Sequence, residues 1–254
     1  MKIMAGATSL FLCLFFPEIS LAMGERIAPI GNIERYFPDE VGMTWTYQGT
    51  IADDVMRIAT YTNVSTVSGL AKKNGVSVKV FQETNQANEG PSESYFLMDA
   101  KGIDYHGGEP TTEFENQLIP YRIIQFDLAL HQPFSQLNKR GISFGRDYDQ
   151  DGIDEMADVY AEITAEGFET VSVPAGVFNN ALKMKGLMVI RLTLSDSGEV
   201  VHIIDRTHTW FALDVGTVKG VESIEFPQFE GLPPLSTVIT ESLSAFSGQP
   251  DQKQ

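Results

Sequence analysis

The stretch VIRLTLSDSGEVVHII, residues 189–204, decides the fold class of this chain. Its two halves, Val189–Leu194 and Val200–Ile204, are rich in β-branched and other apolar residues, as strands are. Its centre, Ser195–Gly198, consists of residues that form turns, and its glycine accepts a positive φ. The stretch therefore predicts a β-hairpin.

The same pattern recurs on both sides of this hairpin. Tyr95–Met98 and Ile103–Tyr105 flank a second turn, Asp99–Gly102. Short strands that are evenly spaced and separated by turn signals indicate an antiparallel domain. We predict a mainly β fold: an antiparallel meander forming a curved sheet, a sandwich or a half-open barrel, with few short helices. Further strand candidates are Met43–Tyr47, Val76–Phe81, Thr207–Phe211 and Thr217–Phe226.

Helix signals are rare. Val177–Met184, which follows Pro174–Gly176, is one candidate for a turn or two of helix, and Thr112–Leu118 is another. Ser236–Phe246 reads either as an edge strand or as a segment that covers the sheet.

The N-terminus has the pattern of a secretory signal peptide. Lys2 precedes an apolar run, Leu10–Phe16, and Ser20-Leu21-Ala22 offers small residues for cleavage before Met23. We therefore expect residues 1–22 to be removed and the mature protein to be periplasmic or secreted. The apolar run is too short to span a bilayer, and no later run reaches that length, so we expect no transmembrane span.

The remainder divides simply. Residues 23–246 are predicted to form a single antiparallel β domain, and the polar tail 247–254 is predicted to be disordered. The chain has one cysteine, Cys13, which lies inside the signal. Leu12 precedes it where a lipoprotein signal prefers a small residue, so we expect no lipid anchor. The mature chain then forms no disulfide.

The net charge limits the partners. With 18 basic and 34 acidic residues, the chain carries a formal charge of −16. Such a protein repels the phosphates of nucleic acids and of anionic lipid headgroups. We expect no nucleic-acid binding, whereas cations and cationic partners are favoured.

One acidic loop carries the sharpest chemical signal. Residues 147–158 read DYDQDGIDEMAD, with aspartate at positions 1, 3 and 5 and glycine at position 6. This spacing turns carboxylates toward one point, and calcium takes six to eight oxygen ligands. We predict a calcium site. Its expected ligands are Asp147, Asp149, Asp151, the carbonyl oxygen of Ile153, Glu155 (directly or through water) and, less readily, Asp158.

The loop departs from a helical EF-hand. Position 8 is Asp154, and the flanks 141–144 and 159–163 read as strands. The loop resembles the D-x-D-x-D-G-x-D-[DE] calcium hairpins between strands of integrin-type propellers. A single copy implies the ion site and not the propeller. We expect the ion to have a structural role; the alternative is a solvated acidic loop without an ion.

Signals for catalysis are weak. The four histidines are His106, His131, His202 and His208. On one strand, His202 and His208 would stand about 20 Å apart, too far to share a zinc ion. The sequence has no G-x-S-x-G, Walker or G-x-G-x-x-G motif. The acidic pairs 113/115 and 222/225 read as exposed charge, so we lean toward a protein that is not an enzyme.

Three further stretches resemble a group of uncharacterised bacterial exported proteins and lipoproteins. They are 36–47 (Y-x-P-x-x-x-G-x-x-W-x-Y), 173–178 (V-P-A-G-x-F) and 210–219 (W-[YF]-A-x-x-V-G-x-V-K). The resemblance implies a mainly antiparallel β domain of the cell envelope with no assigned chemistry. Leu213 replaces the usual proline, and the acidic loop looks like an insertion. Read by their chemistry alone, the three stretches are turns and core.

Two classes of function remain open, with a third as a variant of the first. The first is an exported binding or accessory module with a structural calcium ion and a protein, glycan or lipid ligand. The second is an envelope enzyme, hydrolase-like, that uses the loop ion. The third is a periplasmic carrier of lipid or acyl chains, with an apolar concave face.

Overall fold

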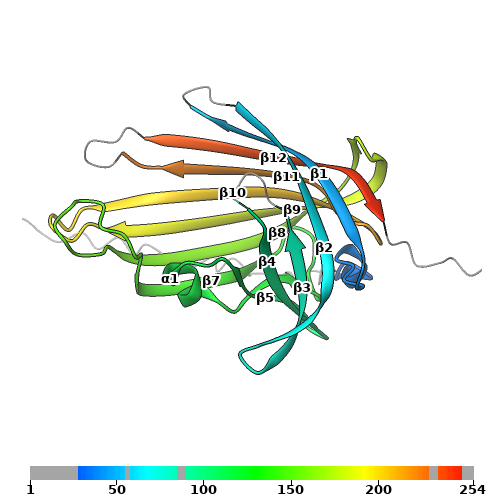
Figure 1. Ribbon diagram of the computed structural model, residues 1–254, viewed down its shortest axis with the longest axis horizontal. Coiled ribbons are helices and arrows are strands. Elements are labelled where there is room, and N and C mark those ends of the chain that lie inside the picture. The colour runs from blue at the N-terminus through cyan, green and yellow to red at the C-terminus, as the bar shows by residue number, and fades with distance from the viewer. Residues whose placement is uncertain (1–27, 55–57, 85–89, 229–233, 248–254) are drawn as a thin grey trace, which may run out of the picture.

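The computed structural model describes residues 28–54, 58–84, 90–228 and 234–247 (Figure 1). The predicted signal peptide, 1–22, and all but the first residue of the predicted disordered tail lie outside the described residues. The structure is mainly antiparallel β, as the sequence predicts. Its strands are β1 Thr44–Asp53, β2 Ile58–Lys73, β3 Val76–Glu83, β4 Ser92–Asp99, β5 Gly102–Glu109, β6 Tyr121–Gln125, β7 Pro133–Ser143, β8 Met156–Val173, β9 Gly176–Thr193, β10 Val200–Ala212, β11 Gly216–Phe226 and β12 Leu235–Ser247.

All these strands belong to one sheet of 12 strands, in the order β6-β5-β4-β3-β2-β1-β12-β11-β10-β9-β8-β7. The order is a meander in which every strand pairs with its neighbour in sequence, except that β6 and β7 form the two edges. The link between the two halves is the pairing of β1 with β12, from Thr44 opposite Ser247 to Asp53 opposite Thr237. The sheet curls into a nearly closed, barrel-like shape, in which β8–β11 run along the long axis and β2–β5 cross them steeply (Figure 1).

The structure corrects two predictions about elements. Val177–Met184 is not helical, because it belongs to β9, which pairs with β8 on one side and β10 on the other. Ser236–Phe246 is neither an edge strand nor a cover, because β12 lies between β1 and β11. The helix predicted near Thr112–Leu118 is confirmed as α1, Glu113–Leu118.

Helix α1 owes its start to a capping box. The Thr112 hydroxyl accepts the backbone N–H of Glu115, and the Glu115 carboxylate accepts the backbone N–H of Thr112. These two bonds satisfy donors that a helix start otherwise leaves open. The helix buries Leu118 beneath it. Neither α1 nor the short 3₁₀ helix η1, Ile33–Tyr36, has the length and hydropathy of a membrane span.

The three stretches that resemble envelope proteins meet in one hydrophobic core. Trp45 donates its indole N–H to the carbonyl oxygen of Val215, at 2.5 Å. Ala175 donates its backbone N–H to Leu243, at 3.0 Å, which brings the middle stretch onto the same core. Their role as turns and core is therefore visible in the packing. The core contains Met43, Trp45, Tyr47, Trp210, Ala212, Val215 and Val218, with Phe37, Val173, Ala175 and Phe178 packed against it.

A second core closes one end of the curled sheet. Ile33 and Tyr36 of η1 are buried there, among side chains from both halves of the sheet. Arg35 pairs with Asp214, and its carbonyl oxygen accepts the backbone N–H of Asp214. The segment before β1 is thereby tied to the turn between β10 and β11.

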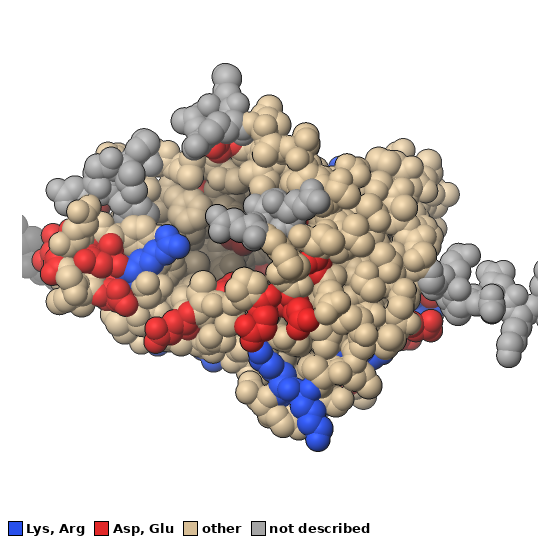
Figure 2. Space-filling model, in the orientation of Figure 1, with Lys and Arg blue, Asp and Glu red and all other residues tan. Residues whose placement is uncertain are grey.

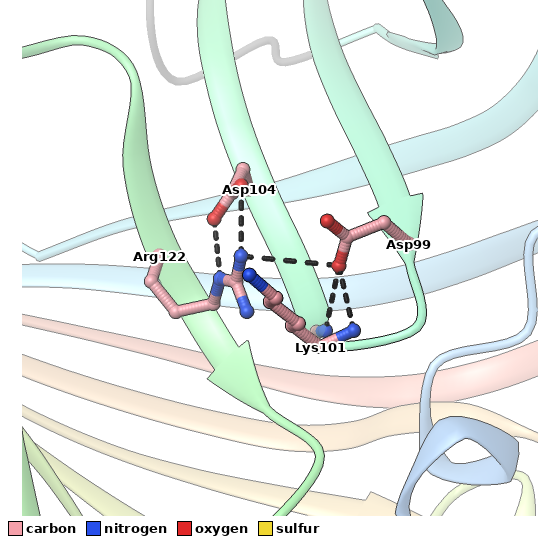
Figure 3. A network of polar contacts seen from close by, with 5 residues as sticks. Asp99, Lys101, Asp104 and Arg122 are labelled. Carbon is pink, nitrogen blue, oxygen red and sulfur yellow. Dashed lines mark hydrogen bonds and ion pairs between the residues drawn. The ribbon is translucent and has the colours of Figure 1, made fainter.

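Edge strand β6 is held by an ion-pair network (Figure 3). The Arg122 guanidinium contacts both carboxylate oxygens of Asp104 on β5, one of them at 3.0 Å. It also lies 3.9 Å from Asp99, whose carboxylate accepts the backbone N–H groups of Lys101 and Gly102. The hydrogen bonds to Asp104 raise the pKa of Arg122. One arginine thus joins the edge strand to the preceding hairpin turn.

Candidate functional site

The acidic loop lies between β7 and β8. A pair of backbone hydrogen bonds closes its base: Phe144 donates to the carbonyl oxygen of Glu155 at 2.8 Å, and Glu155 donates to that of Arg146 at 3.0 Å. The strands that the sequence predicts on both flanks are confirmed. The loop is therefore the connection of a β-hairpin, and not the loop of a helical EF-hand.

Glu155 organises the loop from inside. Its side chain is fully buried, and both of its carboxylate oxygens accept backbone N–H groups. Oε1 accepts from Tyr148 at 3.0 Å and from Asp149 at 3.3 Å, while Oε2 accepts from Ser195 at 2.9 Å. A carboxylate with three such donors is well satisfied in the interior. The geometry gives Glu155 the task of shaping the loop and joining it to the β9–β10 turn.

Three aspartates converge above it. Each of Asp147, Asp149 and Asp151 presents a carboxylate oxygen, and these oxygens all lie within 4.8 Å of one another. Gly152 donates its N–H to Oδ2 of Asp147 at 2.8 Å. The sharp turn gives Gly152 a positive φ of +91°. Oδ1 of Asp147 is buried and meets no hydrogen-bond donor in the described part of the chain.

The turn between β9 and β10 supports two of these aspartates. The backbone N–H of Asp196 donates to Oδ2 of Asp149 at 3.0 Å, and the Ser195 hydroxyl donates to Oδ2 of Asp151 at 2.8 Å. The hydrogen bond from Asp196 is the main reason why the pKa of Asp149 is lowered. This hydrogen bond therefore favours the charged form of Asp149.

The donor set fits a hard divalent cation. Two oxygens on opposite sides of a calcium ion lie at most about 5 Å apart, since each bond is about 2.3 to 2.6 Å long. The spacing of the three aspartates meets this limit. A cation would also give the buried Oδ1 of Asp147 the partner that it needs. Asp147, Asp149 and Asp151 are thus the residues that could hold calcium.

The other predicted ligands lie differently. Asp158 belongs to β8, where it accepts the backbone N–H of Gly141 at 2.9 Å and contacts Arg191 at 3.2 Å. Asp158 therefore supports the pairing of β7 with β8, and it does not belong to the group of three aspartates. Ile153 has an exposed side chain, and its N–H binds Asp151 at 2.8 Å. The role of its carbonyl oxygen as a ligand stays a prediction.

A cavity of about 710 Å³ opens beside the loop, between α1 and the inner faces of β7, β9, β10 and β11. Figure 2 shows that this face of the molecule is hollowed and carries more acidic than basic side chains. The loop contributes Arg146, Tyr148 and Asp154 to the cavity wall. Most of the wall is apolar: Phe114, Leu118, Tyr121, Leu137, Phe144, Met188, Ile190, Ile203, Ile224 and Phe226.

One carboxyl group faces this apolar space from β10. Asp205 lines the cavity, and its Oδ1 is buried without a hydrogen-bond donor among the described residues. Its other contact is a hydrogen bond with Glu222 of β11. Burial raises the pKa of both groups, and together with the nearby Asp205 and Glu241 charges it brings that of Glu222 to about 7. The pair therefore shares a proton readily near neutral pH.

The sequence does not point to this pair. It predicts exposed charge at both Glu222 and Glu225, but in the structure only Glu225 is exposed, next to Arg206 at 2.5 Å. Glu222 is half-buried on the concave face of β11. The available signal was the alternation of β10, in which Asp205 shares a face with the buried Ile203.

The histidines do not gather into a site. His202 is exposed on β10, and His106 is buried in β5. His208 lies 3.7 Å from Glu166 and its ring stands 6.2 Å from that of Trp210. A smaller hollow of about 440 Å³ borders Asp149, and its lining is mainly acidic and small polar: Asp149, Asp196, Ser197, Glu199 and Gln228, with Tyr148, Leu194 and Val201.

Comparisons with known proteins give two distant structural similarities. One is a protein described as exported, with a YmcC-like fold, from Bacteroides fragilis, at 16% identity and a TM-score of 0.39 over 84% of this chain and 98% of that one. The other is described as a lipoprotein, from Parabacteroides distasonis, at 14% identity and a TM-score of 0.37 over the same shares. No family profile matches the sequence, and no curated protein matches it.

Proposed function

We propose that this protein is an exported binding module that holds an apolar small molecule in the 710 Å³ cavity and a structural calcium ion in the 147–158 loop. The observation that carries the proposal is that one loop contributes residues both to the group of three aspartates and to the wall of the cavity. Its aspartates converge at spacings that suit calcium, while Arg146, Tyr148 and Asp154 form part of the cavity wall.

The size and chemistry of the cavity support the binding role. Pockets for small ligands measure roughly 300 to 1,000 Å³ and combine apolar walls with a few polar groups. The cavity falls in this range, and its wall is mainly aliphatic and aromatic. These features favour a small apolar ligand over a glycan or a protein surface. The carrier of lipid or acyl chains, which the sequence leaves open, is the variant of this function that the apolar wall supports.

The position of the aspartates favours a structural ion over a catalytic one. Asp147, Asp149 and Asp151 are not among the residues that line the large cavity. Their hydrogen bonds run to the loop itself and to the β9–β10 turn. A calcium ion there would tie two connections of the sheet together. The hydrolase-like alternative has no comparable support.

Calcium binding is tested by thermal unfolding. A ligand that binds only the native state stabilises it by RT ln(1 + [L]/Kd), about 1.4 kcal/mol at ten times Kd. For a domain of this size, that corresponds to a rise in Tm of about 3 to 5 °C. We expect this rise in about 5 to 10 mM calcium, where exported modules become saturated. Magnesium should give much less, because it prefers a tighter octahedral site.

Matched variants make the test specific. The double substitution Asp147→Asn with Asp151→Asn should abolish the rise in Tm. Asp154→Asn removes a negative charge from the same loop but is exposed and outside the group of three, so it should keep the rise. Calcium titration without heat and without a change in Tm would show that the loop is a solvated acidic turn.

Export is tested by mass spectrometry of the protein from the periplasm or the medium. The N-terminal pattern predicts a mature chain that begins at Met23. Intact chain with Met1 in the cytoplasm would contradict the proposed location.

A further inference from the structure

We propose that the cavity selects an apolar molecule that carries a protonated amine, and that Asp205 binds this amine. The inference rests on the proposed function, since it names the chemical class of the ligand for the same cavity. Its basis is the mismatch between the apolar wall and the carboxylate within it.

At the cavity wall, one carboxylate oxygen of Asp205 lacks a hydrogen-bond donor. A carboxylate oxygen that is removed from water and has no donor is costly, so such oxygens normally have a partner. Oδ1 of Asp205 has none among the described residues, although its side chain reaches Glu222. The wall around it is apolar: Met188 of β9 and Ile224 of β11 pair with Asp205, and Ile203 lies two residues before it on β10. Oδ1 is covered in this structure, so the Asp205 side chain must rotate toward the cavity before an N–H donor of a ligand can supply the missing hydrogen bond.

The surrounding charges determine whether the cavity favours a positively or a negatively charged ligand. Asp205 has the carboxyl group of Glu222 beside it, and Glu222 in turn interacts with Glu241 on β12. The rim adds Glu113, Glu115 and Asp154, against a single basic residue, the exposed Arg146. The field within the cavity therefore attracts cations. A fatty acid would place its carboxylate among like charges, whereas an alkylamine would meet an oppositely charged oxygen and an apolar wall.

The shared proton of the pair adds to this preference. Burial raises the pKa of Glu222, and the carboxyl group can donate to Asp205. A cation bound at Asp205 would favour the ionised form of both groups, because an opposite charge stabilises a carboxylate. Binding of the amine should therefore release a fraction of a proton near pH 7, which calorimetry in two buffers of different ionisation enthalpy can detect.

The experiment compares three ligands that differ only in the head group. Dodecylamine, dodecanol and dodecanoate, each below its micelle concentration, are titrated into the calcium-loaded mature protein with Nile red bound. Dodecylamine is protonated at neutral pH, as a lysine side chain is. We expect it to displace Nile red at concentrations about tenfold lower than dodecanol, which corresponds to about 1.4 kcal/mol. Dodecanoate should be the weakest of the three.

Three variants test whether Asp205 causes the preference for the amine. Asp205→Asn should reduce the affinity for dodecylamine to that for dodecanol and leave Nile red binding in place, which also shows that the variant is folded. Asp127→Asn is the same change at an exposed position outside the cavity and should keep the preference. Glu222→Gln should also keep it, because Asp205 then holds the charge alone.

The outcomes separate the two proposals. If Nile red and all three ligands fail to bind, the cavity is not a binding site and both proposals fall. If Nile red binds but dodecylamine shows no advantage over dodecanol, or the advantage survives Asp205→Asn, the proposed binding function stands and the amine inference is overturned.

Discussion

Glu155 and Glu222 are both carboxyl groups turned away from solvent, yet their surroundings give them opposite effects on the fold. Glu155 faces three backbone N–H groups, from Tyr148, Asp149 and Ser195. Glu222 faces other carboxylates, Asp205 and Glu241, and a charge there is unfavourable. The first residue should therefore stabilise the native state through these hydrogen bonds, and the second should do so as a neutral acid.

Replacing Glu155 tests the first effect. Glu155→Ala would leave three partly buried N–H groups without their acceptor, and a fully buried group left in this way costs about 1 to 3 kcal/mol. Water that enters the space recovers part of this, so we expect a loss of about 3 to 5 kcal/mol in the free energy of unfolding. Urea denaturation measures it. Asp154→Ala, next to it but exposed, should change stability by less than about 0.5 kcal/mol. A small effect of Glu155→Ala would refute the role assigned to Glu155.

The second effect predicts a pH dependence. The pKa of Glu222 in the native state is about 7, above its ordinary value of 4.5, mainly because burial disfavours the charge. The native state thus binds the proton more tightly than the unfolded state, and its contribution to stability is present below about pH 4.5 and lost as pH rises toward 7. The charged groups that act on Glu222 are Asp205 on β10 and Glu241 on β12.

Glu222→Gln should remove this dependence. Since a tenfold change in acidity corresponds to about 1.4 kcal/mol, the variant should gain on the order of 1 to 3 kcal/mol at pH 8 and little at pH 4.5. Urea denaturation at both pH values, with the exposed Glu199→Gln as the control, measures the difference. Equal stabilities of the variant and the parent protein at pH 8 would mean that Glu222 is better solvated than its surroundings indicate.

At the scale of the residue, the sequence allowed part of the site to be predicted. The spacing of Asp147, Asp149 and Asp151 is local, and the structure brings these three together. The role of Glu155 could not be predicted, because one of its donors, Ser195, lies 40 positions away in another hairpin. Asp205 escaped notice for a similar reason: the absence of a donor around its oxygen is a property of the packing and not of its neighbours in sequence.

At the scale of the element, local sequence signals predict short turns correctly. They fail where pairing with other strands determines whether a segment is helical or extended. The hairpin turns at Asp99–Gly102 and Ser195–Gly198 are confirmed, because their residues suit the backbone angles of turns. The prediction of a helical turn at Val177–Met184 is wrong. The residues after Pro174–Gly176 resemble a helix start, but the pairing of β9 with β8 and β10 imposes an extended chain.

The junction of β5 and β6 offers a test of an element. Gly102 has a φ of +154°, and a Cβ built on it would lie 2.1 Å from the backbone oxygen of Ile124 on β6. Gly102→Ala should therefore push the edge strand away and cost about 2 kcal/mol or more. Gly75 also has a positive φ, +83°, but a Cβ there meets nothing within 4 Å. Gly75→Ala should cost about 1 kcal/mol, for the backbone alone.

Hydrogen exchange shows which strands of Gly102→Ala are destabilised. In Gly102→Ala, the amides of β6 should lose protection while those of β9 and β10 keep it, because an edge strand opens without the rest of the sheet. Equal costs of the two substitutions would contradict the close approach between Gly102 and Ile124.

At the scale of the whole molecule, the sheet is a meander closed on itself by one long-range pairing. Strand alternation and turns predict each neighbouring pair, since these pairs are adjacent in the chain. Nothing local predicts that β1 pairs with β12, nearly 200 positions later. This pairing makes one curled sheet where the sequence left a curved sheet, a sandwich and a half-open barrel open. The cavity wall includes Tyr121 of β6 and Leu137 of β7, the two edge strands of this sheet, together with residues of β9, β10 and β11.

The shared loop predicts that the two proposed ligands of the molecule are coupled. The calcium aspartates and the cavity residues Arg146, Tyr148 and Asp154 belong to the same short connection, and Glu155 fixes that connection to the β9–β10 turn. A calcium ion that orders the loop would therefore also order part of the cavity wall, so a ligand in the cavity would lose less freedom on binding. We expect calcium to increase the affinity for Nile red about threefold to tenfold, as coupling energies of about 1 kcal/mol give.

Linkage makes this prediction strict. If calcium raises the affinity for Nile red by some factor, Nile red must raise the affinity for calcium by the same factor. Fluorescence titration with and without calcium, and calcium calorimetry with and without Nile red, measure the two sides independently. Asp147→Asn with Asp151→Asn should abolish the coupling but retain the affinity of the calcium-free protein for Nile red, because neither residue lines the cavity. Equal affinities for Nile red in both conditions, in a protein that does bind calcium, would show that the ion orders the loop without reaching the cavity wall.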